Sequence, residues 1–580
     1  MDGGTWYEHY AWTDVHCLNG SEHTRFKYAR LSEVTLSAST ESDQREVSIP
    51  VLKQQSYTGR RPVVSSSVAA TPCANLGVVG LLEKLNSILS TSHTLNHSLS
   101  SVLKAYIVKD YDFGTVYGHL RPFWYNDLTD IEDKLQRREA WDWKMRQDVL
   151  VNNRIINHQV PPRRVWDLYS NRVLPWWAVR QWPWVISHAW MKEEDRTQVL
   201  TPTNEFEWPV PMPKDANLDL IRIEMLNLGA EYVWLDVLCL RQEHGRNEGL
   251  RSEEWKLDVP TIGGVYRMAY CNRSVCYISG LGRPFGLKAA DLESKTCWFS
   301  RAWTLQETQR RMIIGGDTGD DRFMEKGMRT RVKNQLSLLE EGVGVGGTQT
   351  PVFTVLSEMQ KRVSTNPVDR VAGLSYLLWT DELPAYHAAQ SAEEAWIALV
   401  DEMDVTYRGE LFFLYSKPGS GNRSWHPSWK QVMTEVLPPH PSSLRCSWDG
   451  FLQRRKEKDT DYCCGPCIES GYVRGLAEDS PEGNRRWGEL VVEDNTSVKH
   501  TFEIVVDHQY PIPEGWYALL GSDPFRFELR EIFQGQCWVI GNGVPGQMFK
   551  KVSVFQITNK MDVKRLHDLH IATKAETVLA

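Results

Sequence analysis

Residues 218–235, LDLIRIEMLNLGAEYVWL, join a helical pattern to a short apolar run. The apolar residues that recur every three or four positions, and so share one helix face, are Leu218, Ile221, Met225 and Leu228. Gly229 is placed to end this helix, and the apolar run at 232–235 is typical of a buried strand. A helix that leads directly into a buried strand predicts an α/β unit.

The same alternation continues on both sides of this unit, which predicts a parallel α/β sheet over residues 161–316. The predicted strands are 184–187 (WVIS), 232–235 (YVWL), 275–278 (VCYI) and 312–314. Helical spacing separates the later strands at 259–269 and 301–311. In such a sheet the ligand crevice lies at the carboxyl ends of the strands.

The regions outside the predicted sheet differ from it in composition and in the spacing of their apolar residues. Residues 34–70 are rich in Ser, Thr and Gln with little periodicity, so we predict a largely disordered N-terminal segment over 1–79. Apolar residues at helical spacing predict a helical region over 80–160 and a helical extension over 317–410. Alternation of apolar and polar residues between frequent turns predicts a β-rich C-terminal region over 411–580.

Composition excludes several classes of partner. The 580 residues include 66 Lys and Arg against 74 Asp and Glu, a net charge of −8, without a long basic run. This balance does not favour nucleic acid as a partner. No stretch of 18 apolar residues occurs, and the N-terminus lacks a basic start followed by an apolar core, so neither membrane spanning nor secretion is expected.

The eleven cysteines are scattered along the chain, several of them inside apolar runs. This is typical of reduced, buried thiols in the cytosol or nucleus, and we expect a cytoplasmic protein. Cys463, Cys464 and Cys467 could bind zinc with Cys446 as a fourth ligand. Ordinary thiols are the favoured interpretation, because no second paired-ligand motif accompanies them.

Three blocks of the α/β region resemble a known family: WVISHAW at 184–190, EYVWLDVLCLRQE at 231–243 and CWFSRAWTLQE at 297–307. Their order and spacing are similar to those of fungal heterokaryon-incompatibility (HET) domains. The HET domain is in turn similar to TIR domains, which have a flavodoxin-like sheet and in several lineages cleave NAD at the nicotinamide ribosyl bond. The resemblance implies self/non-self recognition and programmed cell death, with NAD as a candidate substrate.

Two classes of function are compatible with this resemblance. The first is an effector that cleaves NAD, and the second is a non-enzymatic signalling module that self-associates or docks a protein partner. A metal-dependent hydrolase is not favoured, because the sequence has no cluster of His, Asp and Glu ligands at recognisable spacing.

Glu307, the last residue of RAWTLQE, is the candidate catalytic residue. The similar Trp-x-x-x-Glu helix of TIR domains carries the catalytic glutamate. A carboxylate near the ribose stabilises the positive charge that develops as the nicotinamide ribosyl bond breaks. The alternative is that Glu307 makes a surface ion pair with Arg301 or Arg311.

Asp236, Ser187 and His188 are candidate substrate-binding residues at the strand ends. The Asp236 carboxylate could accept ribose hydroxyls, or it could cap a loop or helix. Ser187 and His188 could reach the same crevice, or serve as ordinary hydrogen-bonding loop residues. Adjacent residues on a strand face opposite ways, so they do not form a Ser–His nucleophile by themselves.

Trp190, Trp303 and Arg301 complete the candidate substrate site. Either tryptophan offers a flat face for a nicotinamide or adenine ring, although tryptophan in such blocks is commonly part of the core. Arg301 could bind a phosphate, or it could form a structural ion pair with Asp236 or Glu307.

Overall fold

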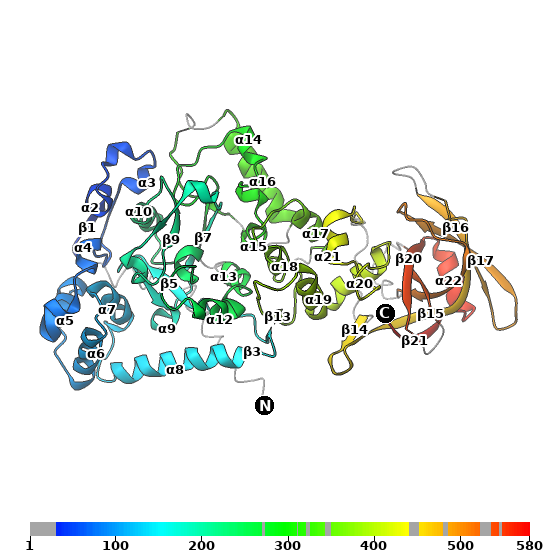
Figure 1. Ribbon diagram of the computed structural model, residues 1–580, viewed down its shortest axis with the longest axis horizontal. Coiled ribbons are helices and arrows are strands. Elements are labelled where there is room, and N and C mark those ends of the chain that lie inside the picture. Colours follow the sequence, from blue (N-terminus) through cyan, green and yellow to red (C-terminus); the bar gives the residue numbers. More distant parts are fainter. Residues whose placement is uncertain are drawn as a thin grey trace. The chain divides into compact units, whose positions relative to one another are not determined.

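The structure is a computed structural model that describes residues 31–268, 273–309, 311–320, 325–342, 350–439, 452–478, 485–522, 535–543 and 548–580 (Figure 1). The chain divides into two compact units. The first holds the described residues up to 341 together with 362–373 and 382–389, and the second holds the remainder.

A six-stranded sheet lies at the centre of the first unit, with strand order β12-β11-β7-β10-β5-β6. Its strands are β5 (Arg164–Asp167), β6 (Arg172–Pro175), β7 (Trp184–His188), β10 (Tyr232–Trp234), β11 (Ser274–Tyr277) and β12 (Ile313–Ile314). The first four strands in the sheet order pair in parallel, which confirms the four predicted strands. The antiparallel hairpin β5–β6 extends the β10 edge.

The helix α10 (Leu218–Leu228) forms as predicted. The Asn217 side chain accepts a hydrogen bond from the Asp219 amide at its start, and Gly229 ends it with a φ of 103°, a conformation that glycine adopts without strain. Two short strands, β8 (Arg196–Val199) and β9 (Val210–Pro213), form a separate hairpin between β7 and α10.

The helix predicted at 301–311 is wrong in length, because α15 covers only Thr304–Glu307. Arg301 is instead held in a β-bridge with Val363, and Thr308 is extended, so the chain leaves helical geometry on both sides. The helix predicted at 259–269 begins later, as α13 (Ile262–Met268). Further helices of this part of the chain are α11 (Asp236–Cys239), α12 (Gly249–Asp258), α14 (Ala289–Leu292), α16 (Met328–Gly342) and α18 (Val368–Ala372).

The expectation of disorder over residues 34–70 is wrong. The segment contains β1 (Val34–Ser37), α2 (Ala38–Ser42), α3 (Leu52–Gln55), β2 (Ser56–Gly59) and α4 (Ser66–Ala69). Its polar residues cap short helices: Ser37 forms a capping box with Thr40, and Ser65 accepts a hydrogen bond from the Val68 amide. The predicted residues 1–30 of the disordered segment lie outside the described ranges.

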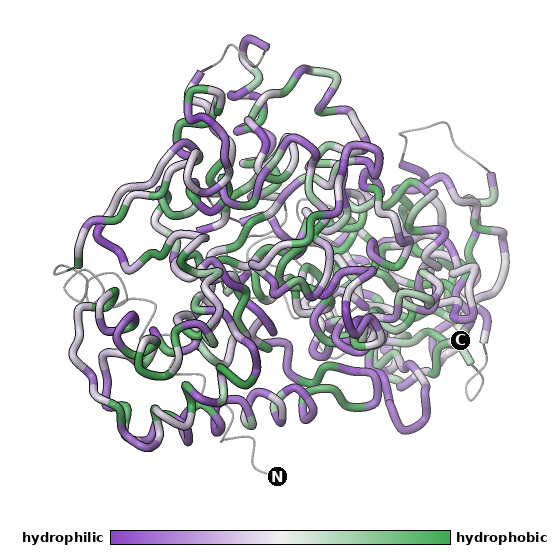
Figure 2. Tube along the Cα trace, turned by 60° about the vertical axis from the view of Figure 1, so that its left-hand side comes forward, coloured by the Kyte–Doolittle hydropathy of each residue, from purple (hydrophilic) through white to green (hydrophobic). Residues whose placement is uncertain are grey.

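The predicted helical region over 80–160 is present. It consists of α5 (Cys73–Leu89), α6 (His97–Val108), α7 (Phe113–Leu120) and α8 (Ile131–Val149) (Figure 1). The short strands β3 (Leu150–Val151) and β4 (Arg154–Ile155) follow, and β4 pairs with both β3 and β13 (Leu383–Pro384). Hydrophilic and hydrophobic residues are interleaved along the trace (Figure 2). Within the described ranges, no helix is both long and apolar enough to cross a membrane.

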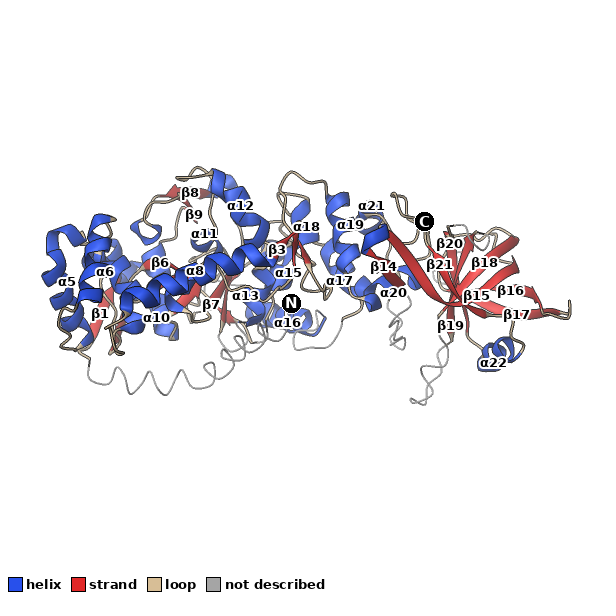
Figure 3. Cartoon of the chain, turned by 90° about the horizontal axis from the view of Figure 1, so that it is seen from below, coloured by secondary structure: helices blue, strands red, loops and turns tan. Residues whose placement is uncertain are grey.

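The second unit is helical at first and β-rich at its end (Figure 3). Its helices α17 (Val352–Gln360), α19 (Ala392–Glu402), α20 (Val405–Leu414) and α21 (Trp429–Thr434) precede the strands, so the β-rich part begins near Leu452 rather than at 411. The strands are β14 (Leu452–Arg455), β15 (Thr460–Arg474), β16 (Arg486–Glu493), β17 (Lys499–Val506), β18 (Gly515–Gly521), β19 (Gln536–Asn542), β20 (Lys550–Ile557) and β21 (Thr573–Val578). Helix α22 (Lys560–Asp568) packs Val563 and Leu566 into their core.

Candidate functional site

The candidate residues gather where the central parallel strands end. Ser187 and His188 are the last residues of β7, and Asp236 begins α11 two residues after β10 ends. β7 lies between β10 and β11 in the sheet, so their carboxyl ends share one edge. This edge is where an open α/β sheet forms a ligand crevice.

Ser187 connects the sheet to Glu307. The Ser187 Oγ lies 2.5 Å from Glu307 Oε2 and donates to it, while the same oxygen accepts a hydrogen bond from Trp298 Nε1 at 2.7 Å. Ser187 and Trp298 are buried, whereas the Glu307 residue is only half-buried. The Trp298 donor therefore orients the serine hydroxyl toward the glutamate.

His188 and Trp190 both bind the Asp236 carboxylate. His188 Nε2 is 2.8 Å from Asp236 Oδ1, and Trp190 Nε1 donates to Oδ2 at 3.2 Å. Burial opposes ionisation of Asp236, but the charge and hydrogen bond of His188 leave its pKa below the usual value. Burial likewise opposes protonation of His188, and the nearby Asp236 raises the His188 pKa overall. The pair thus favours a carboxylate beside an imidazolium.

Glu307 titrates differently from Asp236. Burial raises the Glu307 pKa to about 7; the hydrogen bond from Ser187 lowers it, and the Asp236 charge adds to the increase. Two carboxyl groups at one site thus have pKa values that are pushed apart, an arrangement common in acid–base sites. The Asp236 side chain is 24% exposed and Glu307 is half-buried, so the cluster is partly exposed rather than sealed in the core.

Arg301 and Trp303 lie beside this cluster rather than in its hydrogen-bond network. Both are half-buried, and Trp303 hydrogen-bonds to Asp369. Arg301 makes no ion pair with Asp236 or Glu307 in the part of the chain that the structure describes, so the expected structural pair is wrong. Burial lowers the Arg301 pKa, while the charges of Asp369 and Glu307 oppose this decrease.

Three further residues of the site were not predicted from the sequence. Trp298 lies in the third sequence block, where its indole could have been proposed as a donor. Tyr266 donates from its hydroxyl to the Ile186 carbonyl at 2.9 Å, which supports the end of β7. The Arg196 guanidinium stacks over the Trp190 ring, 5.1 Å from its centroid. The position of Arg196, on a hairpin after β7, gave no local signal.

The described cysteines of the cluster do not form a metal-binding group. Cys463, Cys464 and Cys467 lie on the strand β15, where the adjacent Cys463 and Cys464 face opposite sides. No group of three or more His, Cys, Asp or Glu side chains within the described ranges could hold a metal ion. Cys446, the predicted fourth ligand, lies outside those ranges.

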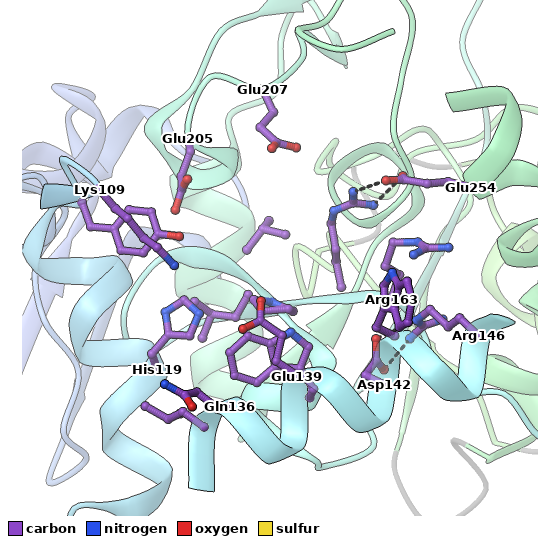
Figure 4. A pocket seen from close by; sticks show the side chains of 18 of the residues that line it. Lys109, His119, Gln136, Glu139, Asp142, Arg146, Arg163, Glu205, Glu207 and Glu254 are labelled. Carbon is purple, nitrogen blue, oxygen red and sulfur yellow. Dashed lines mark hydrogen bonds and ion pairs between the residues drawn. The ribbon is translucent and has the colours of Figure 1, made fainter. Parts of the chain in front are cut away.

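A cavity of about 670 Å³ lies elsewhere in the first unit, between α6, α8, β6 and the loop at 204–208 (Figure 4). None of the seven predicted site residues lines it.

Comparisons of the chain with protein-family models, curated proteins and solved structures find no match.

The raised pKa of Glu307 predicts a specific dependence of stability on pH. The folded chain holds the Glu307 proton up to about pH 7, whereas the unfolded chain releases it near the usual value of 4.5. The free energy of unfolding of the unsubstituted protein, minus that of the Glu307→Gln variant, is therefore expected to fall by about 1–3 kcal/mol as pH rises from 4.5 to 8. Urea unfolding of both proteins across this pH range measures the difference. Titration of His188 and Asp236 affects the stability of both proteins, so its contribution largely cancels in the difference. A pH-independent difference would contradict the assigned environment of Glu307.

Proposed function

We propose that residues 161–316 form a HET domain with a flavodoxin/TIR-like fold, and that the protein is a cytoplasmic effector of fungal self/non-self recognition that triggers cell death by hydrolysing NAD. The observation that carries the proposal is the convergence of Glu307, Ser187 and Asp236 at one partly exposed edge. The sheet order supports it, because the parallel strands lie in the order second, first, third, fourth, as in flavodoxin-like sheets.

The position of the cluster fits a ligand crevice. In this strand order the direction of winding reverses between the first and third strands, here β7 and β11. Ligands of doubly wound sheets bind outside the carboxyl ends at that switch point. Ser187 and His188 end β7 there, and Glu307 reaches the same point from α15.

In the proposed reaction water attacks the ribose C1′ carbon as the bond from C1′ to the nicotinamide nitrogen breaks. Nicotinamide leaves with the electron pair, and the products are ADP-ribose, nicotinamide and a proton. Positive charge develops on the ribose ring as this bond lengthens, and an ionised Glu307 beside the ring stabilises it. A pKa of about 7 also lets Glu307 accept the proton of the attacking water.

The surroundings of Glu307 suit the other parts of NAD. Trp190 holds the Arg196 guanidinium over its ring and donates to Asp236, and the Asp236 carboxylate retains acceptor capacity for ribose hydroxyls. Arg196 and Arg301 influence each other electrostatically, and neither makes an ion pair with a carboxylate among the described residues. Two such guanidinium groups could bind the pyrophosphate.

The direct test incubates the purified full chain with NAD and quantifies nicotinamide and ADP-ribose by chromatography. Stoichiometric formation of both products is the expected result. The non-enzymatic alternative predicts no turnover and no thermal stabilisation by NAD, together with self-association or binding of a protein partner. That combined result would replace the enzymatic proposal by the signalling module.

Forced dimerisation of the chain in a fungal host is expected to slow growth in a dose-dependent way, the resemblance of residues 161–316 to incompatibility proteins being the reason for this expectation. Growth curves at several inducer concentrations measure the effect. The dimerising tag alone is the control. Normal growth, with soluble dimers verified in the cells, would count against the cell-death role.

A further inference from the structure

We infer that the 670 Å³ cleft of the first unit is a binding site for a small organic cation, separate from the proposed NAD site. The cleft combines an aromatic wall, carboxylates without a counter-charge and a buried acceptor without a donor. It lies within one compact unit and shares no residue with the Glu307 cluster.

The cleft has an excess of negative charge. Seven carboxylates and four Lys or Arg side chains line it. The three arginines are already neutralised: Arg146 by Asp142, Arg163 by Asp258 and Arg164 by Glu254. The wall that carries these arginines is therefore electrically balanced, and the excess charge lies elsewhere in the cleft.

Among the described residues, three carboxylates of the lining have no ion-pair partner: Glu132, Glu139 and Glu205. Burial raises the pKa of Glu205 above its usual value. Glu205 lies on one side of the hollow and Glu139, on α8, on the other (Figure 4). Glu205 accepts a hydrogen bond from Thr115 Oγ1 at 3.1 Å, but neither carboxylate has an ion-pair partner among the described residues. Two opposed carboxylates of this kind can bind a cation between them.

Aromatic rings form the wall next to these carboxylates. His119 stacks on Tyr111 with centroids 6.1 Å apart and an interplanar angle of 4°, and Trp177 lies 5.7 Å from His119. Burial lowers the His119 pKa to about 4, so the ring is neutral at physiological pH and does not repel a cation. The Lys109 ammonium lies 5.8 Å from the Tyr111 centroid, so a bound cation would compete with Lys109 for this ring.

A buried acceptor provides independent support. Asn204 lines the cleft and is only 3% exposed. Its Nδ2 donates to the Trp208 carbonyl at 2.8 Å, while its Oδ1 has no hydrogen-bond partner. A buried amide oxygen without a donor is costly, and the N–H group of a bound ammonium or guanidinium would satisfy it.

Isothermal titration of the purified full chain with agmatine and spermidine tests this assignment, with neutral 1,4-butanediol and anionic glutarate as matched non-cations. We expect saturable binding of at least one cation, stronger at low salt, and none of the controls. Glu205→Gln and Glu139→Gln should each weaken binding by about tenfold or more. Both residues are exposed, so these variants should fold, which their circular dichroism and melting curves check.

Two further variants separate a specific site from general charge attraction. Lys109→Gln should strengthen binding several-fold, because it removes a competing positive charge from the Tyr111 ring. Asp133→Asn, an equal charge change on an exposed residue of α8 outside the cleft, should have no effect. Absence of binding, or an equal loss in the Asp133 variant, would overturn the inference. So would binding of a basic peptide without the small cations. None of these outcomes depends on NAD turnover.

Discussion

Replacing Glu307 by Gln is expected to reduce NAD hydrolysis about a hundredfold or more. The substitution preserves size and removes the charge that would stabilise the ribose cation, and catalytic acid–base groups typically contribute 10²- to 10⁴-fold. The amide can still accept a hydrogen bond from Ser187, so the geometry around β7 should persist. Initial rates of nicotinamide release from the purified variant measure the loss.

Glu194→Gln is the matched control for this experiment. Glu194 is an exposed carboxylate in the turn after β7, and its replacement changes the net charge equally without touching the cluster. We expect near-normal turnover. If Glu307→Gln retains full activity and unchanged stability, Glu307 is a structural residue, and the main reason for regarding the protein as an enzyme disappears.

The four parallel strands were predictable because each is a short apolar run that must be covered on both faces. β7 and β11, for example, are almost entirely buried and pair along four residues. Strand order was not predictable, since it depends on pairings between distant segments. The hairpin β5–β6 was missed for a related reason, because RVWD and RVLP mix polar and apolar residues.

The site was predictable as a group of residues but not as a set of contacts. Asp236 and Ser187 follow apolar runs, so a shared strand edge could be inferred from local sequence. The hydrogen bond between Ser187 and Glu307 joins residues that are 120 positions apart, and Glu307 ends α15, whose length was overestimated from local periodicity. The environment that raises the Glu307 pKa comes from the fold as a whole.

Disorder over residues 34–70 was a wrong prediction because composition cannot reveal a long-range buried ion pair. Glu41, in α2, has a side chain that is 1% exposed and lies 3.1 Å from Arg222 of α10. Arg222 is itself fully buried and also donates to the carbonyls of Val64 and Leu168. One arginine thus connects the N-terminal segment to the helix beside the sheet.

Arg222→Leu is therefore expected to destabilise the first unit by about 3–5 kcal/mol, because it leaves Glu41 buried without its counter-ion and two carbonyls without their donor. Urea unfolding measures the loss, and limited proteolysis should show cleavage within 31–70 at lower protease concentrations. Lys192→Leu is the control: Lys192 and Glu194 form an exposed pair, worth less than about 1 kcal/mol. Equal stabilities of the two variants would mean that the segment contributes little to the unit, and that its packing against α10 does not depend on the Arg222–Glu41 pair.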